Sequence, residues 1–227
     1  AITWDDQSAT TASSGGSTTY TTAQAIATIR TTDPIRTGYT FGGWFTQANG
    51  AGTQVTNGSY TPPTPYGTVT LYAKWTANTN NAITWDDQSA TTASSGGSTT
   101  YTTAQPITTI RTTAPLRTGY TFGGWFTQTN GAGTQVTNGS YTPISPYGTI
   151  TLYAKWTANT YSVTYNGNSN TSGTVPSNAT ATYNSTFTVA SNIGSLVRTG
   201  YTFAGWNTAA DGSGTNYSEG TGSFTFL

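Results

Sequence analysis

The sequence predicts a mostly β protein in which three small tandem repeat modules form an elongated array. The nine residues "RTGYTFGGW" at 36–44 return unchanged at 117–125, and "RTGYTFAGW" follows at 198–206, so the spacing is 81 residues each time. Thr and aromatic residues alternate with runs rich in Gly, Asn and Pro, a composition typical of strands joined by turns. A fixed long period indicates a repeat architecture.

The period sets the predicted module boundaries at 1–79, 80–160 and 161–227. Residues 1–81 and 82–162 differ at only ten positions. The third copy has diverged further, but it keeps the nine-residue phrase and a Gly-rich turn. It reaches "SFTFL" without a counterpart of "TLYAKW". We therefore expect module three to lack its closing strand.

Each complete module contains segments that predict strands in a fixed order. "AITW" opens the module with alternating apolar residues, and "GYTFGGW" places Tyr39 and Phe41 on one face of a second strand. "TVTLYAKW" at 68–75 shows the clearest period of two and predicts the closing strand. The stretch "TTAQAIATIRTT" at 21–32 is ambiguous, and we allow at most one short helix per module there.

The linkers between modules predict a semi-rigid rod. "TANTNN" at 76–81 and "TANTYS" at 157–162 are short, and neither contains Pro or a long Gly/Ser run. Such segments hold neighbouring repeats close together, whereas long Gly/Ser linkers leave them independent.

The composition excludes several classes of function. The chain has 7 basic and 7 acidic residues, a formal net charge of zero, and no Cys or His. A nucleic-acid binder needs clustered Lys and Arg, so we expect no nucleic-acid partner. No apolar run approaches the roughly 20 residues of a spanning helix, so we expect no membrane insertion. Disulfides and thiolate or imidazole metal sites are excluded, and no cofactor is predicted.

The combination of "GYTFGGW", "GAGT" and "TVTLYAKW" resembles the Listeria–Bacteroides repeat, known as the B-repeat of internalin B and found in many bacterial surface proteins. The resemblance covers essentially all of modules one and two, and the "RTGYTFAGW" and "DGSGTNY" portions of module three. Modules one and two depart from the usual pattern at the start, where "ITWDDQSATTASSGGS" replaces a shorter turn. This resemblance implies a compact β-grasp-like module of the α+β class, secreted or attached to the cell wall, without enzymatic activity.

The repeated aromatic residues are predicted to be structural core, because they lie at strand spacing beside glycines. The predicted core residues are Tyr39, Phe41, Trp44 and Trp75 in module one, Tyr120, Phe122, Trp125 and Trp156 in module two, and Tyr201, Phe203 and Trp206 in module three. Trp4 and Trp85 lie beside acidic pairs, and we predict them as exposed candidate binding residues.

The acidic pairs Asp5–Asp6 and Asp86–Asp87 are the only clusters of carboxylates. Glycoside cleavage needs two carboxyls across a cleft, and Ca²⁺ takes about 6–8 oxygens, usually from several acidic residues in one loop. Module three has Asn166 and Gly167 near this position. We interpret the pairs as solvated turns and assign no catalytic residue and no metal ligand.

The sequence therefore favours a non-enzymatic extracellular segment of a bacterial surface protein or adhesin that acts as a stalk, a spacer or part of a filament. Its expected partners are neighbouring repeats or other copies of the chain. Two alternatives stay open. One is a filament subunit completed by a strand from a neighbouring chain, and the other is an adhesive module that binds a cell-surface or host protein or a glycan.

Overall fold

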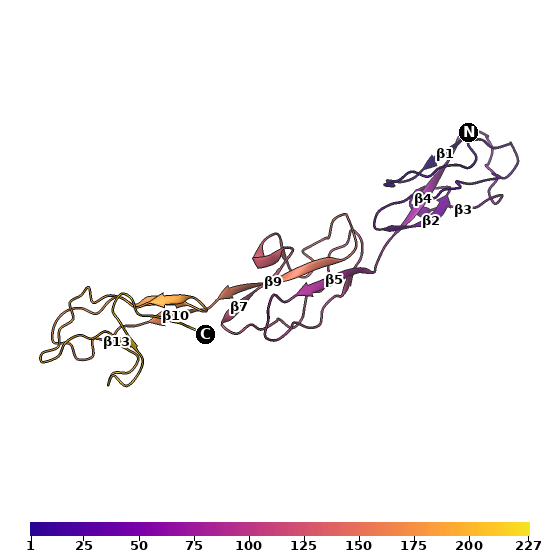
Figure 1. Ribbon diagram of the computed structural model, residues 1–227. Coiled ribbons are helices and arrows are strands. Elements are labelled where there is room, and N and C mark those ends of the chain that lie inside the picture. Colours follow the sequence, from indigo (N-terminus) through magenta and orange to yellow (C-terminus); the bar gives the residue numbers. More distant parts are fainter.

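The computed structural model describes residues 1–227 and shows three bodies in a row (Figure 1). We name them units one, two and three, after the predicted modules. Nearly all regular structure is β, and the only helices are single 3-10 turns, η1 (Ala48–Gly50) and η2 (Thr129–Gly131). The prediction of a mostly β chain with three repeats is confirmed. The segment at 21–32, where a short helix was allowed, forms turns and extended chain.

Unit one is a four-stranded sheet in the order β1-β4-β2-β3 (Figure 1). Its strands are β1 (Ile2–Asp5), β2 (Tyr39–Phe45), β3 (Gln54–Val55) and β4 (Val69–Ala77). The closing strand β4 lies in the middle, parallel to β1 and antiparallel to β2. The sheet of unit one thus depends on its last strand, because that strand joins the first strand to the rest of the sheet.

Unit two repeats this sheet and adds one strand, in the order β6-β5-β9-β7-β8. Its strands are β5 (Asn81–Asp86), β6 (Thr100–Tyr101), β7 (Tyr120–Phe126), β8 (Gln135–Val136) and β9 (Ile150–Ala158). In both units a register shift separates the phenylalanine from the tryptophan of the repeated phrase. Gly43, at φ +100°, and Gly124, at φ +103°, supply the backbone conformation that such a bulge requires.

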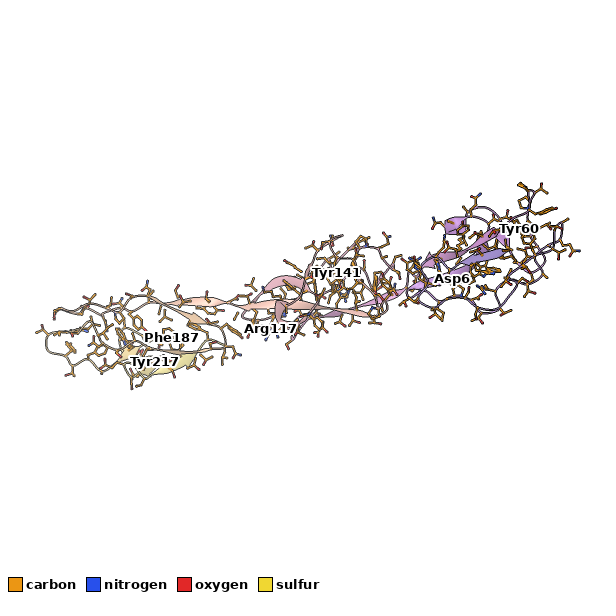
Figure 2. The ribbon with its side chains drawn as sticks, turned by 90° about the horizontal axis from the view of Figure 1, so that it is seen from above. Asp6, Tyr60, Arg117, Tyr141, Phe187 and Tyr217 are labelled. Carbon is orange, nitrogen blue, oxygen red and sulfur yellow. The ribbon has the colours of Figure 1, made fainter.

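Unit three has three separate two-stranded sheets in place of one continuous sheet. The pairs are β10 (Thr160–Val163) with β11 (Ala179–Thr182), β12 (Thr186–Thr188) with β15 (Ser223–Thr225), and β13 (Trp206–Asn207) with β14 (Asn216–Tyr217). Phe224 lies between Phe187 and Tyr217, with a ring centroid 5.3 Å from each. Figure 2 shows Phe187 and Tyr217 in the same part of this unit.

Units one and two each enclose a compact apolar core. The core of unit one contains Ile2, Ile26, Trp44, Val55, Leu71 and Ala73, and the core of unit two contains Ile83, Tyr101, Ile107, Trp125, Val136, Leu152 and Ala154. The closing strand provides its alternate residues to each core, as its period of two predicts. Unit three buries fewer apolar side chains, namely Ala181, Val189 and Leu196.

Candidate functional site

The tryptophan of the repeated phrase is the centre of the core in units one and two. Trp44 and Trp125 are 0 % and 1 % exposed. Around Trp44, the rings of Phe41 and Trp4 make edge contacts with centroids 5.6 Å and 4.8 Å away, and Phe41 also contacts Trp75. Such edge-to-face packing contributes about 0.5–1.5 kcal/mol per pair beyond the burial of apolar area. Here the aromatic phrase packs into the unit's own interior.

Trp4 and Trp85 differ from the expectation that they are exposed binding residues. Both are half-buried, because each ring packs edge-on against the central tryptophan of its unit. The indole N–H of Trp4 donates to the Ser17 carbonyl over 3.1 Å, and Arg30 lies over the ring at 5.3 Å. A ring covered in this way does not offer a free face to a sugar. Ile2 and Ile83 lie two residues earlier on the same face of each strand and are buried, and this alternation is the sequence signal that could have revealed the packing.

Tyr201 also differs from its expected place in the core. It is 68 % exposed, whereas its counterparts Tyr39 and Tyr120 are half-buried. Phe203 and Trp206 stay half-buried and contact each other, with centroids 5.2 Å apart. The physical reason is the closing strand, which borders the tyrosine in units one and two and has no counterpart in unit three.

The acidic pairs organise the turn that follows the first strand. Asp5 accepts a hydrogen bond from the Gln7 amide over 2.9 Å, and Asp6 accepts one from the Ser13 amide over 3.0 Å. The Asp6 carbonyl also accepts from the Trp75 indole over 2.9 Å. Figure 2 places Asp6 in the half of unit one that faces unit two. These contacts give the carboxylates a structural role within one loop.

The joints between units are built from residues that the sequence analysis did not select. At the first joint, Asn78 connects the two units. Its amide donates to the Gly38 carbonyl over 2.9 Å, and its side-chain oxygen accepts from the Thr40 hydroxyl over 2.8 Å. Its carbonyl accepts from the Thr103 amide over 2.9 Å and from the Asn81 side chain over 3.2 Å. One asparagine therefore ties the end of unit one to the start of unit two.

The second joint repeats this arrangement with Asn159. Its amide donates to the Gly119 carbonyl over 2.9 Å, and its side-chain oxygen accepts from the Thr121 hydroxyl over 2.7 Å. Its carbonyl accepts from the Tyr183 amide of unit three over 2.8 Å. The repeated "TAN" of the two linkers is the sequence signal that could have identified both asparagines.

An aromatic ring from the following unit covers a glycine at each joint. Gly38 and Gly119 have φ of +82° and +74°, and a Cβ on them would overlap Tyr147 and Tyr183 respectively. Tyr183 also packs against Tyr120 with centroids 5.4 Å apart. Tyr147 and Tyr183 occupy different positions in their units. The two joints therefore share the covered glycine and not the position of the tyrosine. In unit three the equivalent Gly200 has nothing within 4 Å.

An arginine opens each of the three phrases and lies over the tyrosine three residues later. The guanidinium carbons of Arg36 and Arg117 are 4.0 Å and 3.9 Å from the ring centroids of Tyr39 and Tyr120. Figure 2 places Arg117 toward the end of unit two that faces unit three. Cation–π contacts of this kind contribute about 0.5–1 kcal/mol at exposed sites. The spacing Arg-x-x-Tyr in all three phrases is the signal that could have revealed them.

The structure contains no helix with the length and apolar character needed to cross a membrane. It also brings together no group of three or more acidic side chains that could hold a metal ion. The features that recur are the core of units one and two and the joints between units.

The comparison with protein families gives three consecutive matches to the Listeria-Bacteroides repeat domain, over residues 1–74, 75–155 and 161–226. Internalin H of Listeria monocytogenes is 34% identical over 132 residues, which cover 56% of this chain and 21% of that protein. A protein of Evansella cellulosilytica, described as a Gly-rich membrane protein, is 42% identical over 112 residues, which cover 46% of this chain and 12% of that protein. No solved structure matches the chain.

The matched segments span less than a quarter of each of these relatives. The similarity therefore concerns the repeat, which occurs in bacterial surface proteins, and not the whole of any relative. The family matches cover nearly the full chain, and the resemblance inferred from "GYTFGGW" and "TLYAKW" is confirmed. The chain belongs to the Listeria-Bacteroides repeat family and consists of three consecutive copies of its domain.

Proposed function

We propose that the chain is a non-enzymatic, extracellular stalk or spacer segment that holds other parts of a bacterial surface protein apart. The observation that carries this proposal is the joint: at both junctions an asparagine bonds to both units, and a tyrosine of the following unit covers a glycine of the preceding one. A stalk needs joints that resist bending, because a flexible chain of domains collapses to a shorter average length.

The linkers support a stiff connection. β4 ends at Ala77 and β5 begins at Asn81, and β9 ends at Ala158 and β10 begins at Thr160. The one to three residues between these strands are themselves hydrogen-bonded to both neighbours through Asn78 and Asn159. The units therefore have little backbone left with which to reorient.

We also infer a β-grasp-like module. The supporting feature is the parallel pairing of the first and last strands, in which Ile2 pairs with Val69 and Asp5 with Tyr72. The antiparallel β2 lies on the other side of the last strand. The sheet has no α-helix across its face, so the likeness rests on the strand arrangement alone.

The extracellular assignment and the link to adhesion rest on the relatives. One is named Internalin H and the other is described as a membrane protein. The low charge of the chain and its many small hydroxyl side chains agree with a surface location. A stalk on such a protein would display other domains and need no catalytic residue of its own.

The test is a matched pair of substitutions, Gly119→Ala and Gly200→Ala. Both glycines have positive φ, +74° and +81°, so both variants carry the same backbone strain of about 1–2 kcal/mol. Only Gly119 is covered by a residue of the next unit. Because the chain has no cysteine, spin labels can be attached at Cys introduced for the exposed Ile144 and Ile193, one in each unit.

Double electron–electron resonance then measures the distribution of distances between the two labels. We expect a narrow distribution in the parent chain, a clearly broader one in Gly119→Ala, and no broadening in Gly200→Ala. A broad distribution in the parent chain would contradict the stalk proposal. Equal distributions in all three proteins would show that the tyrosine contact does not stiffen the joint.

A second candidate function, adhesion, is favoured by one repeated surface feature. Ile35, Leu116 and Val197 precede the three arginines and are 60 %, 63 % and 51 % exposed. Exposed aliphatic residues at the same place in every unit offer a repeated contact to a partner protein. The test is binding of the parent chain to bacterial and host cells, compared with a variant carrying Ser at all three positions. Equal binding of the two proteins would contradict this candidate.

A further inference from the structure

The first and the last long strand of unit two are parallel neighbours. β5 pairs with β9 at four consecutive positions, the first of which joins Ile83 to Ile150. β5 begins at the joint with unit one, and β9 ends at the joint with unit three. Figure 1 shows both strands directed along the row of units. The backbone therefore enters and leaves unit two through two strands that lie side by side.

A pull along the array loads this pairing in one particular direction. Because the two strands are parallel, tension on the start of β5 and on the end of β9 makes the strands slide past each other. The hydrogen bonds of the ladder lie across the direction of sliding, so all of them resist together. If the same strands were separated from one end, the pairs would break one after another. The parallel arrangement thus places the ladder where it resists tension best.

A side-chain hydrogen bond closes the far end of this ladder. The last pair joins Asp86 to Tyr153. The carbonyl of the next residue, Asp87, accepts a hydrogen bond from the indole N–H of Trp156 over 2.9 Å. Since Trp156 belongs to β9, this bond adds a cross-link just beyond the end of β5. We call the β5–β9 ladder together with the Trp156–Asp87 bond the clamp.

Buried side chains hold β5 in the same place. Ile83 of β5 and Leu152 of β9 are 7 % and 1 % exposed. The ring of Trp85, also in β5, packs edge-on against Trp125 with centroids 4.8 Å apart. On the side away from β9, the Ile83 amide donates to the Thr99 carbonyl over 2.8 Å. Sliding of β5 would break these contacts together with the clamp.

Unit one contains the same arrangement. β1 pairs in parallel with β4, and the Val69 amide at the start of β4 donates to the Ala1 carbonyl over 2.9 Å. The indole N–H of Trp75 donates to the Asp6 carbonyl over 2.9 Å. The parallel ladder and the indole bond that follows it therefore recur in both units.

We propose that the clamp makes this repeat a load-bearing module, which keeps its fold when the surface protein is pulled. The inference goes beyond the stalk proposal and does not rest on it. Stiff joints resist bending, whereas the clamp resists stretching, and a flexible array can also carry tension. Forced unfolding is governed by the rate of unfolding and not by equilibrium stability, so the clamp has to be tested under load.

The first test pulls on unit two of the 227-residue chain in two directions at the same constant force. The chain has no cysteine, so Cys introduced in pairs at exposed positions are the only points of attachment. Asn80→Cys with Thr160→Cys loads the clamp along its strands, and Asn80→Cys with Thr149→Cys separates β5 from β9 at one end. We expect unit two to stay folded at least about tenfold longer in the first direction, since its bonds then share the load. Equal lifetimes in the two directions would overturn the proposal.

A matched pair of variants, Trp156→Phe and Trp75→Phe, tests the indole bond. Phenylalanine keeps an aromatic ring but has no N–H to donate. With attachment at positions 80 and 160, only unit two carries the load. Trp156→Phe should then unfold about fivefold faster than the parent, since the clamp has lost one hydrogen bond. Trp75→Phe makes the same change in unit one, outside the loaded segment, and should keep the lifetime of the parent. An unchanged lifetime in Trp156→Phe, or an equal loss in both variants, would overturn the assignment of the clamp.

The second direction distinguishes the clamp from a general loss of stability. Separation from the end at Ile83 reaches the Trp156–Asp87 bond last, so Trp156→Phe should keep the parent's lifetime in this direction. Equally faster unfolding in both directions would mean that the bond contributes only to overall stability, and would overturn its role in the clamp. The stalk test measures bending between units two and three, whereas these measurements load unit two alone. Each proposal can therefore fail without the other.

Discussion

Units two and three contain nearly the same nine residues, "RTGYTFGGW" and "RTGYTFAGW", but only unit two makes a full strand of them. In unit two the last six residues of the phrase, together with Phe126, form β7, which pairs with β9 and with β8. In unit three only Trp206 and Asn207 are in a strand, and Tyr201 is 68 % exposed. The difference lies outside the phrase, in the presence or absence of a closing strand.

This comparison shows that the formation of a strand depends on a neighbouring strand as much as on the segment's own sequence. β-branched and aromatic residues favour strands because they pack against cross-strand neighbours. Where β9 provides those neighbours, Thr121 and Phe122 are extended and paired with it. Where no such strand lies beside them, the same residue types remain unpaired.

The largest expected contrast is in hydrogen exchange. The Thr121 amide lies in the β7–β9 ladder, and the Thr202 amide has no backbone partner. Small domains are stable by about 5–15 kcal/mol, so a ladder amide that opens only with the unit exchanges at least about a thousandfold more slowly than a free one. NMR-detected exchange on the 227-residue chain measures both amides. Similar rates would show that β7 is frayed and would remove the contrast.

The central tryptophans should differ in their contribution to stability. Trp125 is 1 % exposed in a complete core, so Trp125→Ala should lower the free energy of unfolding of unit two by about 3–5 kcal/mol. Trp206 is half-buried, and Trp206→Ala should cost unit three only about 1–2 kcal/mol, because its side chain removes less apolar area from water. Chemical denaturation monitored separately for each unit by NMR provides the measurement. Equal losses would mean that Trp206 is packed as closely as Trp125.

Asn81, near the start of unit two, and Ser162, near the start of unit three, provide a finer comparison. Asn81 is buried, and its side-chain amide donates to Asn78, Tyr101 and Thr103. Asn81→Ala leaves buried acceptors without a donor and should cost about 1–3 kcal/mol. Its counterpart in the repeat frame, Ser162, is exposed, and Ser162→Ala should change stability by less than about 0.5 kcal/mol. Thermal melts of the two variants test this, and a larger loss in Ser162→Ala would contradict it.

The smallest expected effect is a pH dependence confined to unit three. The hydroxyl and the amide of Ser213 both donate to Asp211 and hold the pKa of its carboxyl below its ordinary value. A lowered pKa stabilises the folded state above the unfolded value, near 4, and this gain is lost as the pH falls through the folded value. Asp211→Asn should therefore remove a small difference in unit-three stability between pH 7 and pH 2. Since units one and two have Asn49 and Asn130 at this position, their turns provide an internal control.

Much of the fold could be predicted from the sequence. The period of 81 residues identified the repeats, and the alternation in "TVTLYAKW" identified the closing strand whose Leu71 and Ala73 are fully buried. The exposure of individual aromatic residues could not be predicted in the same way. Trp4 stands beside two aspartates in the sequence, but its ring packs on Trp44, because β1 pairs with a strand more than 60 residues away.

The sequence by itself determined the repeats, the mostly β character and the position of the closing strand in units one and two. These follow from local patterns, because period and alternation are visible within a few residues. Only the tertiary structure decided how the units join and which aromatic side chains are exposed. Asn78 and Tyr147 contribute to the first joint through contacts between residues far apart in the chain. Tyr201 is exposed and Tyr120 is half-buried although their phrases are nearly identical, because exposure depends on the segments that pack beside each phrase.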